Sequence, residues 1–301
     1  MDFSILIGLV STEDCERIFE ILESLRNQDG VHRYEVIIAD RRNDVVSCQL
    51  EENFPEVKRI ECPADTPLPE LRTIALDHAN GTYIPVIEDH NIPSVNWLTS
   101  IVQAFADSPE GTVAVGGCVE NGVCDTPLDW ATFLCEYSYF LAPIEEGDTN
   151  VLPGMNVAYH HSVFTDIDRK LLTCGFWETT LHPVLLEKGL KMFSTNKIKL
   201  FHCKKFSFGL FVRQRFIYSR YYAGLRFEHK QRLKRLFACI ATPLLPPLLL
   251  LRSAKQIKDK NRLTREFKSA MPILLLFYIV WAYGEMVGYL FGKGDALSQI
   301  E

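Results

Sequence analysis

Three consecutive residues that can bind metal ions follow a strand-like stretch of this 301-residue chain. The run "TYIPVIEDH" is apolar up to Ile87 and then continues with Glu88, Asp89 and His90. Carboxylates and an imidazole can hold a divalent cation, and such a mixed set suits Mn²⁺ somewhat better than Mg²⁺. The alternative is that these side chains only cap the strand and the next loop, because short acidic clusters are common at strand ends.

The first 110 residues alternate between strand-like and helix-like patterns. Apolar runs over residues 4–10, 34–40, 56–62 and 82–89 predict four strands, and helical periodicity over 13–28 and 68–80 predicts two helices. Strands separated by helices favour a mostly parallel sheet, in which ligands bind beyond the carboxyl ends of the strands. Ser11 follows the first strand and Asp40 ends the second, so we expect both at the same edge as Glu88.

Two common phosphate-binding patterns are missing from the sequence. No GxGxxG follows the first strand, and no GxxxxGK[ST] occurs anywhere in the chain. A phosphate-rich ligand would therefore need another counterion. A divalent metal at Glu88 and His90 would serve, because it neutralises a diphosphate and stabilises a departing phosphate.

The order of several short motifs resembles the family 2 glycosyltransferases. An acidic-x-acidic pair, a Pro and a Trp-Leu are matched by Glu88, His90, Pro93 and "WL", with histidine in place of the second acid. Upstream, Arg72 and "ANGTYI" match the family's Arg and Ala-x-Gly-x-Tyr-Ile, and "GMNVAY" further on matches Gly-x-Asn-x-Ala-Tyr. The resemblance covers roughly residues 3–230.

This resemblance implies an α/β fold of the GT-A type, with a mostly parallel sheet flanked by helices. It also implies an inverting enzyme that uses a nucleotide sugar. The donor would be bound by Ser11, Asp40 and Arg72 together with Glu88 and Asp89, and Asp40 would contact the nucleoside base. The metal, Mn²⁺ or Mg²⁺, would be held by Glu88, His90 and a histidine late in the domain, His202.

Inverting transfer needs a general base that removes the proton of the attacking acceptor hydroxyl. The resemblance assigns this role to Glu178, which begins an apolar-periodic helix after "GFW". The alternative is a first-turn carboxylate that only complements the helix dipole. His182, one turn later, could steer that carboxylate or bind the acceptor, or simply lie on the helix surface. His202 could likewise be an ordinary histidine at a domain edge.

Charge divides the chain into an acidic part and a basic part. Up to Cys203 there are 14 Lys/Arg and 32 Asp/Glu, and from Lys204 onward there are 18 and 6. We expect a catalytic domain over 1–203, a basic aromatic amphipathic region over 204–235 and hydrophobic membrane-associated helices over 236–301. The nine cysteines have no framework spacing, and the N-terminus lacks a signal-peptide pattern, which favours reduced cytosolic thiols.

The basic region precedes two apolar stretches, which favours a membrane surface over nucleic acid as its partner. The linker over 252–269 carries seven Lys/Arg and two acids, so the positive-inside rule places it on the cytoplasmic side. The alternative is a soluble hydrophobic helical subdomain. Pro243, Pro246 and Pro247 are expected to break the first stretch midway.

Together these features predict a glycosyltransferase anchored at the cytoplasmic face of a membrane. It would move one sugar from a UDP- or GDP-linked donor to a lipid-linked or glycan acceptor, as in the synthesis of cell-envelope polysaccharides. Single transfer is expected because Gln214 is followed by Arg215 and Phe216, and not by the Gln-x-x-Arg-Trp of processive synthases. One alternative is a catalytically silent protein that binds a sugar nucleotide or acts as a membrane scaffold. A second alternative, a nucleotidyltransferase, is disfavoured because no Gly-rich loop with Arg or Lys follows the first strand.

Overall fold

The computed structural model describes residues 1–227 and 231–301. The chain divides into two compact units, one of residues 1–122 with 140–204 and the other of residues 123–139 with 205–301. Residues 123–139, which we expected within the catalytic domain, group with the C-terminal part. Residues 228–230 of the predicted basic region lie outside the described residues.

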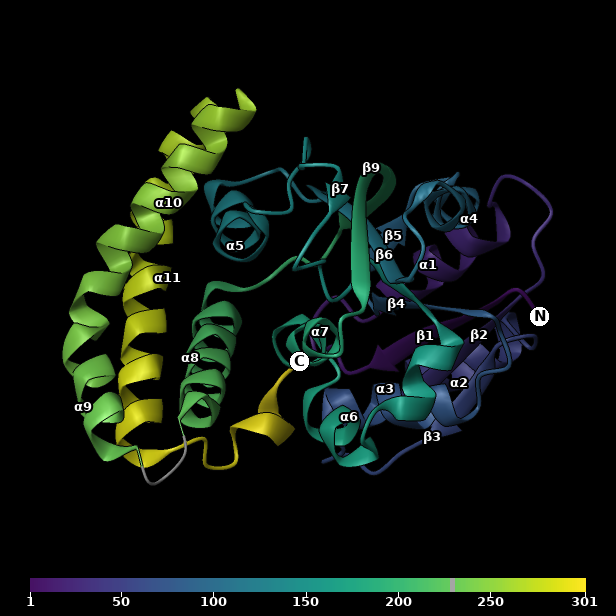
Figure 1. The fold of residues 1–301 in the computed structure, drawn as a ribbon, viewed down its shortest axis with the longest axis horizontal. Helices are drawn as coiled ribbons and strands as arrows, with labels where there is room; N and C mark the ends of the chain where they lie inside the picture. Colours follow the sequence, from purple (N-terminus) through teal and green to yellow (C-terminus); the bar gives the residue numbers. More distant parts are fainter. Residues whose placement is uncertain (228–230) are drawn as a thin grey trace. The chain divides into compact units, whose positions relative to one another are not determined.

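The first unit is built on a mixed sheet of nine strands, in the order β3-β2-β1-β4-β8-β6-β9-β5, with β7 paired to β9 (Figure 1). The strands β3, β2, β1 and β4 are parallel, as expected, whereas β8 pairs antiparallel with both β4 and β6. The strand bounds are β1 Phe3–Leu9, β2 Tyr34–Asp40, β3 Lys58–Glu61, β4 Tyr83–Glu88, β5 Asn91–Pro93, β6 Thr112–Asn121, β7 Gly147–Asp148, β8 Val157–His160 and β9 Lys191–His202. The predicted α/β fold is confirmed.

Helices of this unit connect the strands. Their bounds are α1 Arg17–Arg26, α2 Val45–Asn53, α3 Leu68–Asp77, α4 Trp97–Asp107, η1 His161–Asp166, α6 Arg169–Gly175 and α7 Glu178–Glu187. The helix α2 is not among the elements predicted from the sequence. Asp44 begins it by accepting hydrogen bonds from the backbone N–H groups of Val46 and Ser47, and the Ser47 hydroxyl accepts from the Asp44 N–H.

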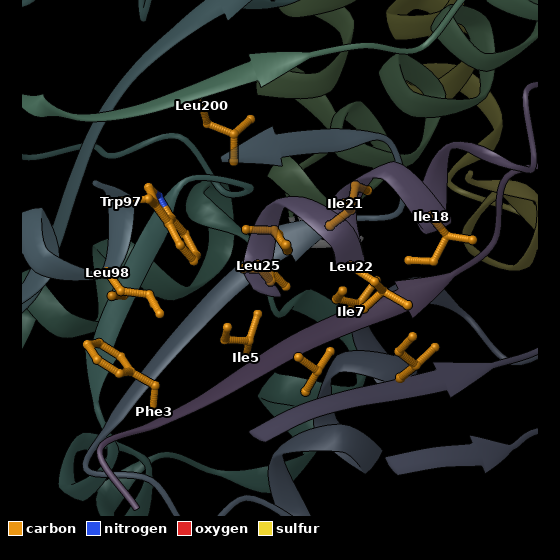
Figure 2. Packing of buried hydrophobic residues seen from close by; sticks show 14 of the residues in the cluster. Phe3, Ile5, Ile7, Ile18, Ile21, Leu22, Leu25, Trp97, Leu98 and Leu200 are labelled. Carbon is orange, nitrogen blue, oxygen red and sulfur yellow. The ribbon is translucent and has the colours of Figure 1, made fainter. Parts of the chain in front are cut away.

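The two faces of β1 pack against different helices. Phe3, Ile5 and Ile7 point to the face covered by α1 and α4, where Ile21, Leu22, Trp97 and Leu98 join one buried cluster (Figure 2). On the opposite face, a Cβ atom on Gly8 would lie 2.6 Å from Leu68 of α3, so glycine allows α3 to approach closely. Burial on both faces fixes the register of β1 and therefore the position of its carboxyl end.

Asn156 ties three elements of this core together. Its Oδ1 accepts from Trp97 Nε1 at 2.8 Å, and its Nδ2 donates to the carbonyls of Cys118 at 2.9 Å and Ile198 at 3.2 Å. We expect Asn156→Ala to lower the free energy of unfolding by about 3 kcal/mol, because it leaves buried polar partners unpaired. Urea denaturation beside the exposed control Asn150→Ala measures the difference. Equal stability of the two variants would contradict this structural role.

The second unit is helical. Its elements are α5 Pro127–Tyr137, α8 Phe208–Arg226, α9 Arg232–Ala241, η2 Thr242–Leu244, α10 Leu245–Lys260, α11 Thr264–Phe291 and η3 Ala296–Gln299. The prolines expected to break the first apolar stretch produce only the single 3-10 turn η2 between α9 and α10. By length and composition, Arg232–Lys260 and Thr264–Phe291 are each able to cross a membrane.

Candidate active site

The carboxyl ends of β1, β2 and β4 lie side by side. In the parallel register, Leu9 pairs with Asp40 and Gly8 pairs with Glu88. The residues that follow these strand ends are therefore held at one edge, as the sequence predicted. Ser11, Glu88, Asp89 and His90 gather there, and His202 joins them because β9 pairs with β5 directly after the loop.

Asp89 holds the segment after β1. Its Oδ2 accepts from the backbone N–H groups of Val10 at 2.8 Å and Ser11 at 2.7 Å, and its Oδ1 accepts from the Ser11 hydroxyl at 2.6 Å. Burial opposes its ionisation, but hydrogen bonds with His90 and Ser11 and the nearby positive charges outweigh burial and hold the pKa of Asp89 well below its usual range. Asp89 is thus an ionised acceptor buried beneath the site.

His90 lies between two carboxylates. Its Nδ1 is 2.9 Å from Asp89 Oδ1, and its Nε2 is 3.4 Å from Glu88 Oε2. Burial alone would lower the pKa of His90, but the hydrogen bonds to Asp89 and Glu88 raise it. A carboxylate bound to one ring nitrogen orients the ring and directs the other nitrogen toward a ligand. Here that second nitrogen faces Glu88.

His202 is the neighbour of His90 on β9. The two imidazole rings are perpendicular with centroids 4.9 Å apart, and the Cys203 N–H donates to the His90 carbonyl at 3.0 Å. Burial, together with the charge of His90, lowers the pKa of His202 well below its ordinary value. His202 is therefore neutral at physiological pH, which is the form in which imidazole binds a metal.

Glu88 is linked to the helix that carries Glu178. Arg72 donates through Nη2 to Glu88 Oε1 at 3.2 Å and through Nη1 to the carbonyl of Phe176 at 2.9 Å. Burial raises the pKa of Glu88, but His90 and Arg72 outweigh it and lower that pKa to about 2. Arg72 is itself buried, so in this structure it positions Glu88 and the segment before α7.

Glu178 is the first residue of α7. A Cβ atom on Gly154 would lie 2.1 Å from Glu178 Oε2, so the loop that contains residue 154 passes close to the carboxylate, which would have to move to make room for a larger residue there. His182, one turn later, is buried rather than on the helix surface: its Nε2 is 2.9 Å from the Tyr159 hydroxyl and its Nδ1 accepts from the Leu152 N–H at 3.4 Å. Burial lowers the pKa of His182 to about 3. The surface alternative for His182 is wrong.

Asp40 ends β2 and is fully buried. Its carboxylate accepts from the Arg42 N–H at 2.8 Å and pairs with Arg59 Nε at 2.7 Å. These contacts fix the turn after β2. Contact between Asp40 and a nucleoside base remains a prediction.

Lys204 is a part of this site that the sequence analysis missed. Its buried Nζ donates to the Ser11 hydroxyl at 3.1 Å. Burial raises the pKa of Asp89, and the charge of Lys204 adds to the larger effect of His90 in lowering it. We had read Lys204 as the start of the basic tail. Lys204 lies two residues after His202, and alternate residues of an extended segment share one side. This spacing was the available signal that Lys204 lies on the same side as His202.

The donor set at Glu88 and His90 fits a divalent cation. The 3.4 Å separation of Glu88 Oε2 and His90 Nε2 is close to the roughly 3 Å between adjacent ligands that each lie about 2.1 Å from one metal. Asn91 Oδ1 is buried without a hydrogen-bond partner among the described residues, and its Nδ2 lies 3.4 Å from Glu88 Oε2. Within residues 1–227 and 231–301, no group of three or more His, Cys, Asp or Glu side chains is arranged to hold a metal. The structure thus presents an oxygen and a nitrogen ligand with His202 beside them.

The sequence comparisons point to one family. The profile described as Glycosyl transferase family 2 matches residues 11–172, which is more than half of the chain. Among curated proteins, none matches the sequence.

Several solved structures are similar in fold. A mannosyltransferase of Pyrobaculum calidifontis, solved with GDP-Man and Mn²⁺, has a TM-score of 0.57 at 14% identity over 97% of this chain and 87% of that one. TarS 1-349 of S. aureus has a TM-score of 0.50 at 14% identity, over 99% and 91% of the two chains. GalNAc-T7, with UDP, GalNAc and Mn²⁺, has a TM-score of 0.52 at 12% identity over 69% of this chain. The match spans only 44% of GalNAc-T7, and 60% of the TarS fragment in its UDP-GlcNAc complex.

Proposed function

Because this chain belongs to glycosyl transferase family 2, we propose that it transfers one sugar from a nucleotide-sugar donor to an acceptor hydroxyl, with inversion at the anomeric carbon. The observation that carries this proposal is the link from Glu88 through Arg72 to the segment that presents Glu178. Through Arg72, the carboxylate proposed to act at the leaving diphosphate is connected to the segment that precedes the carboxylate proposed to take the acceptor proton, which supports a shared site.

The donor is a UDP- or GDP-linked sugar in this proposal. Similar folds have been solved with GDP-Man and with UDP, which supports this class of ligand. The base would lie near Asp40 at the end of β2, and the diphosphate would lie over Ser11. Lys204 supplies a buried positive charge next to Ser11, which suits a diphosphate.

A divalent cation, Mn²⁺ or Mg²⁺, would be held by Glu88, His90 and His202. When bound, it supplies positive charge to the leaving diphosphate. Asp89 fixes the ring of His90, and Arg72 fixes the carboxylate of Glu88, so both ligands are oriented before the metal arrives. Asp89 therefore acts on the donor indirectly, through His90 and Ser11.

Glu178 acts as the general base. Its carboxylate removes the proton of the acceptor hydroxyl while that oxygen attacks the anomeric carbon from the side opposite the diphosphate. The nearby charge of Glu178 adds to burial in raising the pKa of Tyr159, which keeps that phenol neutral beside the carboxylate. His182 and Tyr159 thus form a neutral, hydrogen-bonded pair near the base.

The acceptor in this proposal is a lipid-linked or cell-envelope precursor, and the enzyme works at the cytoplasmic face of a membrane. The support is the pair of apolar helical segments in the second unit and the basic linker between them. Single transfer is part of the proposal, because Arg215 and Phe216 follow Gln214 where processive enzymes carry another motif.

A donor panel tests the proposed function. Purified full-length protein is heated with UDP- and GDP-linked sugars, each with and without Mn²⁺, and the melting temperature is recorded. We expect one donor class to raise the melting temperature in the presence of Mn²⁺, because a ligand bound only to the folded state stabilises it. No shift with any nucleotide sugar would contradict the proposal, and binding without transfer to any acceptor would favour the silent binding protein.

Lys204→Met is expected to raise the Kd for the donor about 10-fold, because it removes a charge-assisted contact to the diphosphate. The control is Lys205→Met, whose side chain is exposed and 3.8 Å from Asp125. Calorimetry at fixed Mn²⁺ measures both variants. Equal donor affinities for the two would exclude Lys204 from the donor site.

A further inference from the structure

The second unit has an uninterrupted apolar stripe on its outer surface. Its members run from α9 through η2 into α10 at spacings of three or four residues, apart from the adjacent pair Leu236 and Phe237, and they are 52–72% exposed: Leu233, Leu236, Phe237, Ile240, Leu244, Leu248 and Leu251. This spacing places them on one side of a continuous helical segment. No residue of α9 is buried.

Positive charge flanks this stripe at both ends. Arg232, Lys234 and Arg235 lie in the first turn of α9, and Arg252, Lys255, Lys258 and Lys260 lie in α10. Asp259 is the only acid between residues 232 and 260. An exposed apolar stripe between basic clusters matches the interface of an anionic lipid surface, where side chains enter the acyl boundary and cations contact headgroups.

The neighbouring helix α11 carries a second exposed stripe. Its large exposed side chains are Leu275, Leu276, Ile279, Tyr283, Leu290 and Phe291. Arg235 of α9 donates to the Tyr289 carbonyl at the end of α11 at 2.6 Å, so the two helices are joined there. The two exposed stripes therefore belong to helices that contact each other.

The packing of α11 against α8 argues against a membrane-spanning α11. A Cβ atom on Gly284 would lie 2.0 Å from Ser219 Oγ, and one on Gly288 would lie 2.5 Å from the Arg220 carbonyl, so α8 and α11 are in close contact. The helix α8 carries four arginines. If α11 crossed the bilayer, α8 would have to enter with it or the contact would be lost.

Two of these arginines bind acids within the same unit. Arg226 Nη1 lies 3.2 Å from Glu285 Oε2, and Glu285 also accepts from Trp281 and Tyr289 of α11. Arg215 pairs with Glu136 of α5 at 2.9 Å, and its guanidinium lies 4.3 Å from the centre of the Trp281 ring. The contacts of Glu285 explain how a carboxylate is accommodated in an apolar helix. Contacts of both kinds are typical of a folded helical unit and not of an isolated membrane-spanning helix.

The charge-free part of the first segment is also short. Residues 236–251 are uncharged, whereas the uncharged run of α11 continues from residue 269 to residue 291 with only Glu285 interrupting it. At about 1.5 Å per residue, the 16 residues 236–251 extend about 24 Å as a helix, which is less than the ~30 Å hydrocarbon core.

We propose that α9, α10 and α11 lie in the plane of an anionic phospholipid surface without crossing it. The stripe from Leu233 to Leu251 enters the boundary between headgroups and acyl chains, and the flanking lysines and arginines contact the headgroups. This inference rests on the proposed membrane location of the enzyme and gives it a specific form. Binding to lipid is measured without donor or acceptor, so its outcome is separate from that of transfer activity.

Flotation of the full-length protein with sealed vesicles tests the surface. We expect binding to vesicles of phosphatidylcholine with phosphatidylglycerol to exceed binding to phosphatidylcholine alone by roughly 10-fold, and to fall at high salt. Replacing Leu233, Phe237 and Ile240 together by Gln should reduce partitioning at least about 30-fold. The matched control replaces Val31, Val45 and Val95, which are also exposed, by Gln and should bind as the wild type does.

Labelling of cysteines placed before and after α11 distinguishes a helix that lies in the membrane plane from one that crosses the membrane. The cysteines that are not buried, Cys15, Cys48, Cys124, Cys174 and Cys239, are replaced by Ser. Asp259→Cys, near the end of α10 and before α11, and Lys293→Cys, just after α11, are then introduced one at a time. On sealed vesicles, a membrane-impermeant maleimide should label both variants from outside. Protection of one end would show that α11 spans, and unchanged flotation of the triple Gln variant would show that the stripe does not bind lipid; either result overturns the proposal.

Discussion

Glu178→Gln is expected to bind the nucleotide-sugar donor as the wild type does and to transfer sugar at least about 100 times more slowly. Glutamine keeps the size of glutamate, and the glycine at residue 154 leaves the same space for the amide. The amide cannot take up the proton of the acceptor hydroxyl, so only the chemical step should suffer. Donor affinity by calorimetry and single-turnover transfer rates separate the two effects.

Glu187→Gln at the end of the same helix is the matched control. It changes charge equally, but it is exposed and nine residues from the base. We expect its transfer rate to equal that of the wild type. A Glu178→Gln enzyme that turns over normally would remove Glu178 as the base and leave it as a first-turn residue that complements the helix dipole.

His90→Ala is expected to weaken Mn²⁺-dependent donor binding about 100-fold, because it removes the nitrogen ligand that faces Glu88. His90→Asp should retain binding and shift the preference from Mn²⁺ toward Mg²⁺, since Mg²⁺ favours oxygen ligands. Calorimetry of the donor with each metal, for the wild type and both variants, measures the shift.

Stability without metal is the control for these two variants, because His90 also bonds to Asp89. A variant that melts close to the wild type in metal-free buffer retains the fold, and its donor affinity is then interpretable. Donor binding that needs no metal and is unchanged in His90→Ala would show that Glu88, Asp89 and His90 only cap the strand.

The edge of the sheet could be predicted because its signals are local. The apolar runs of β1, β2 and β4 end in polar residues, and parallel pairing brings these ends together whatever the rest of the chain does. The antiparallel insertion of β8 between β4 and β6 could not be predicted, because hydrophobic alternation carries no information on strand direction.

Other features depend on contacts distant in sequence. Asp89 was expected to bind the donor, yet in the structure it holds Val10 and Ser11, which are about 80 residues away. Lys204 reaches Ser11 across 193 residues, so its spacing of two from His202 indicates the side on which it lies but not this partner. By contrast, Asp44 and Ser47, which cap the start of α2, are neighbours in sequence, so their pattern is a local signal that predicts this helix.

The central claim is that this site performs inverting glycosyl transfer with Glu178 as its base. The most direct measurement follows the anomeric configuration of the product by NMR, with the donor selected by the binding panel, for the wild type and Glu178→Gln at equal concentration. The account predicts product of inverted configuration from the wild type and at least about 100-fold less from the variant. Product of retained configuration, or equal product from both proteins, would contradict it.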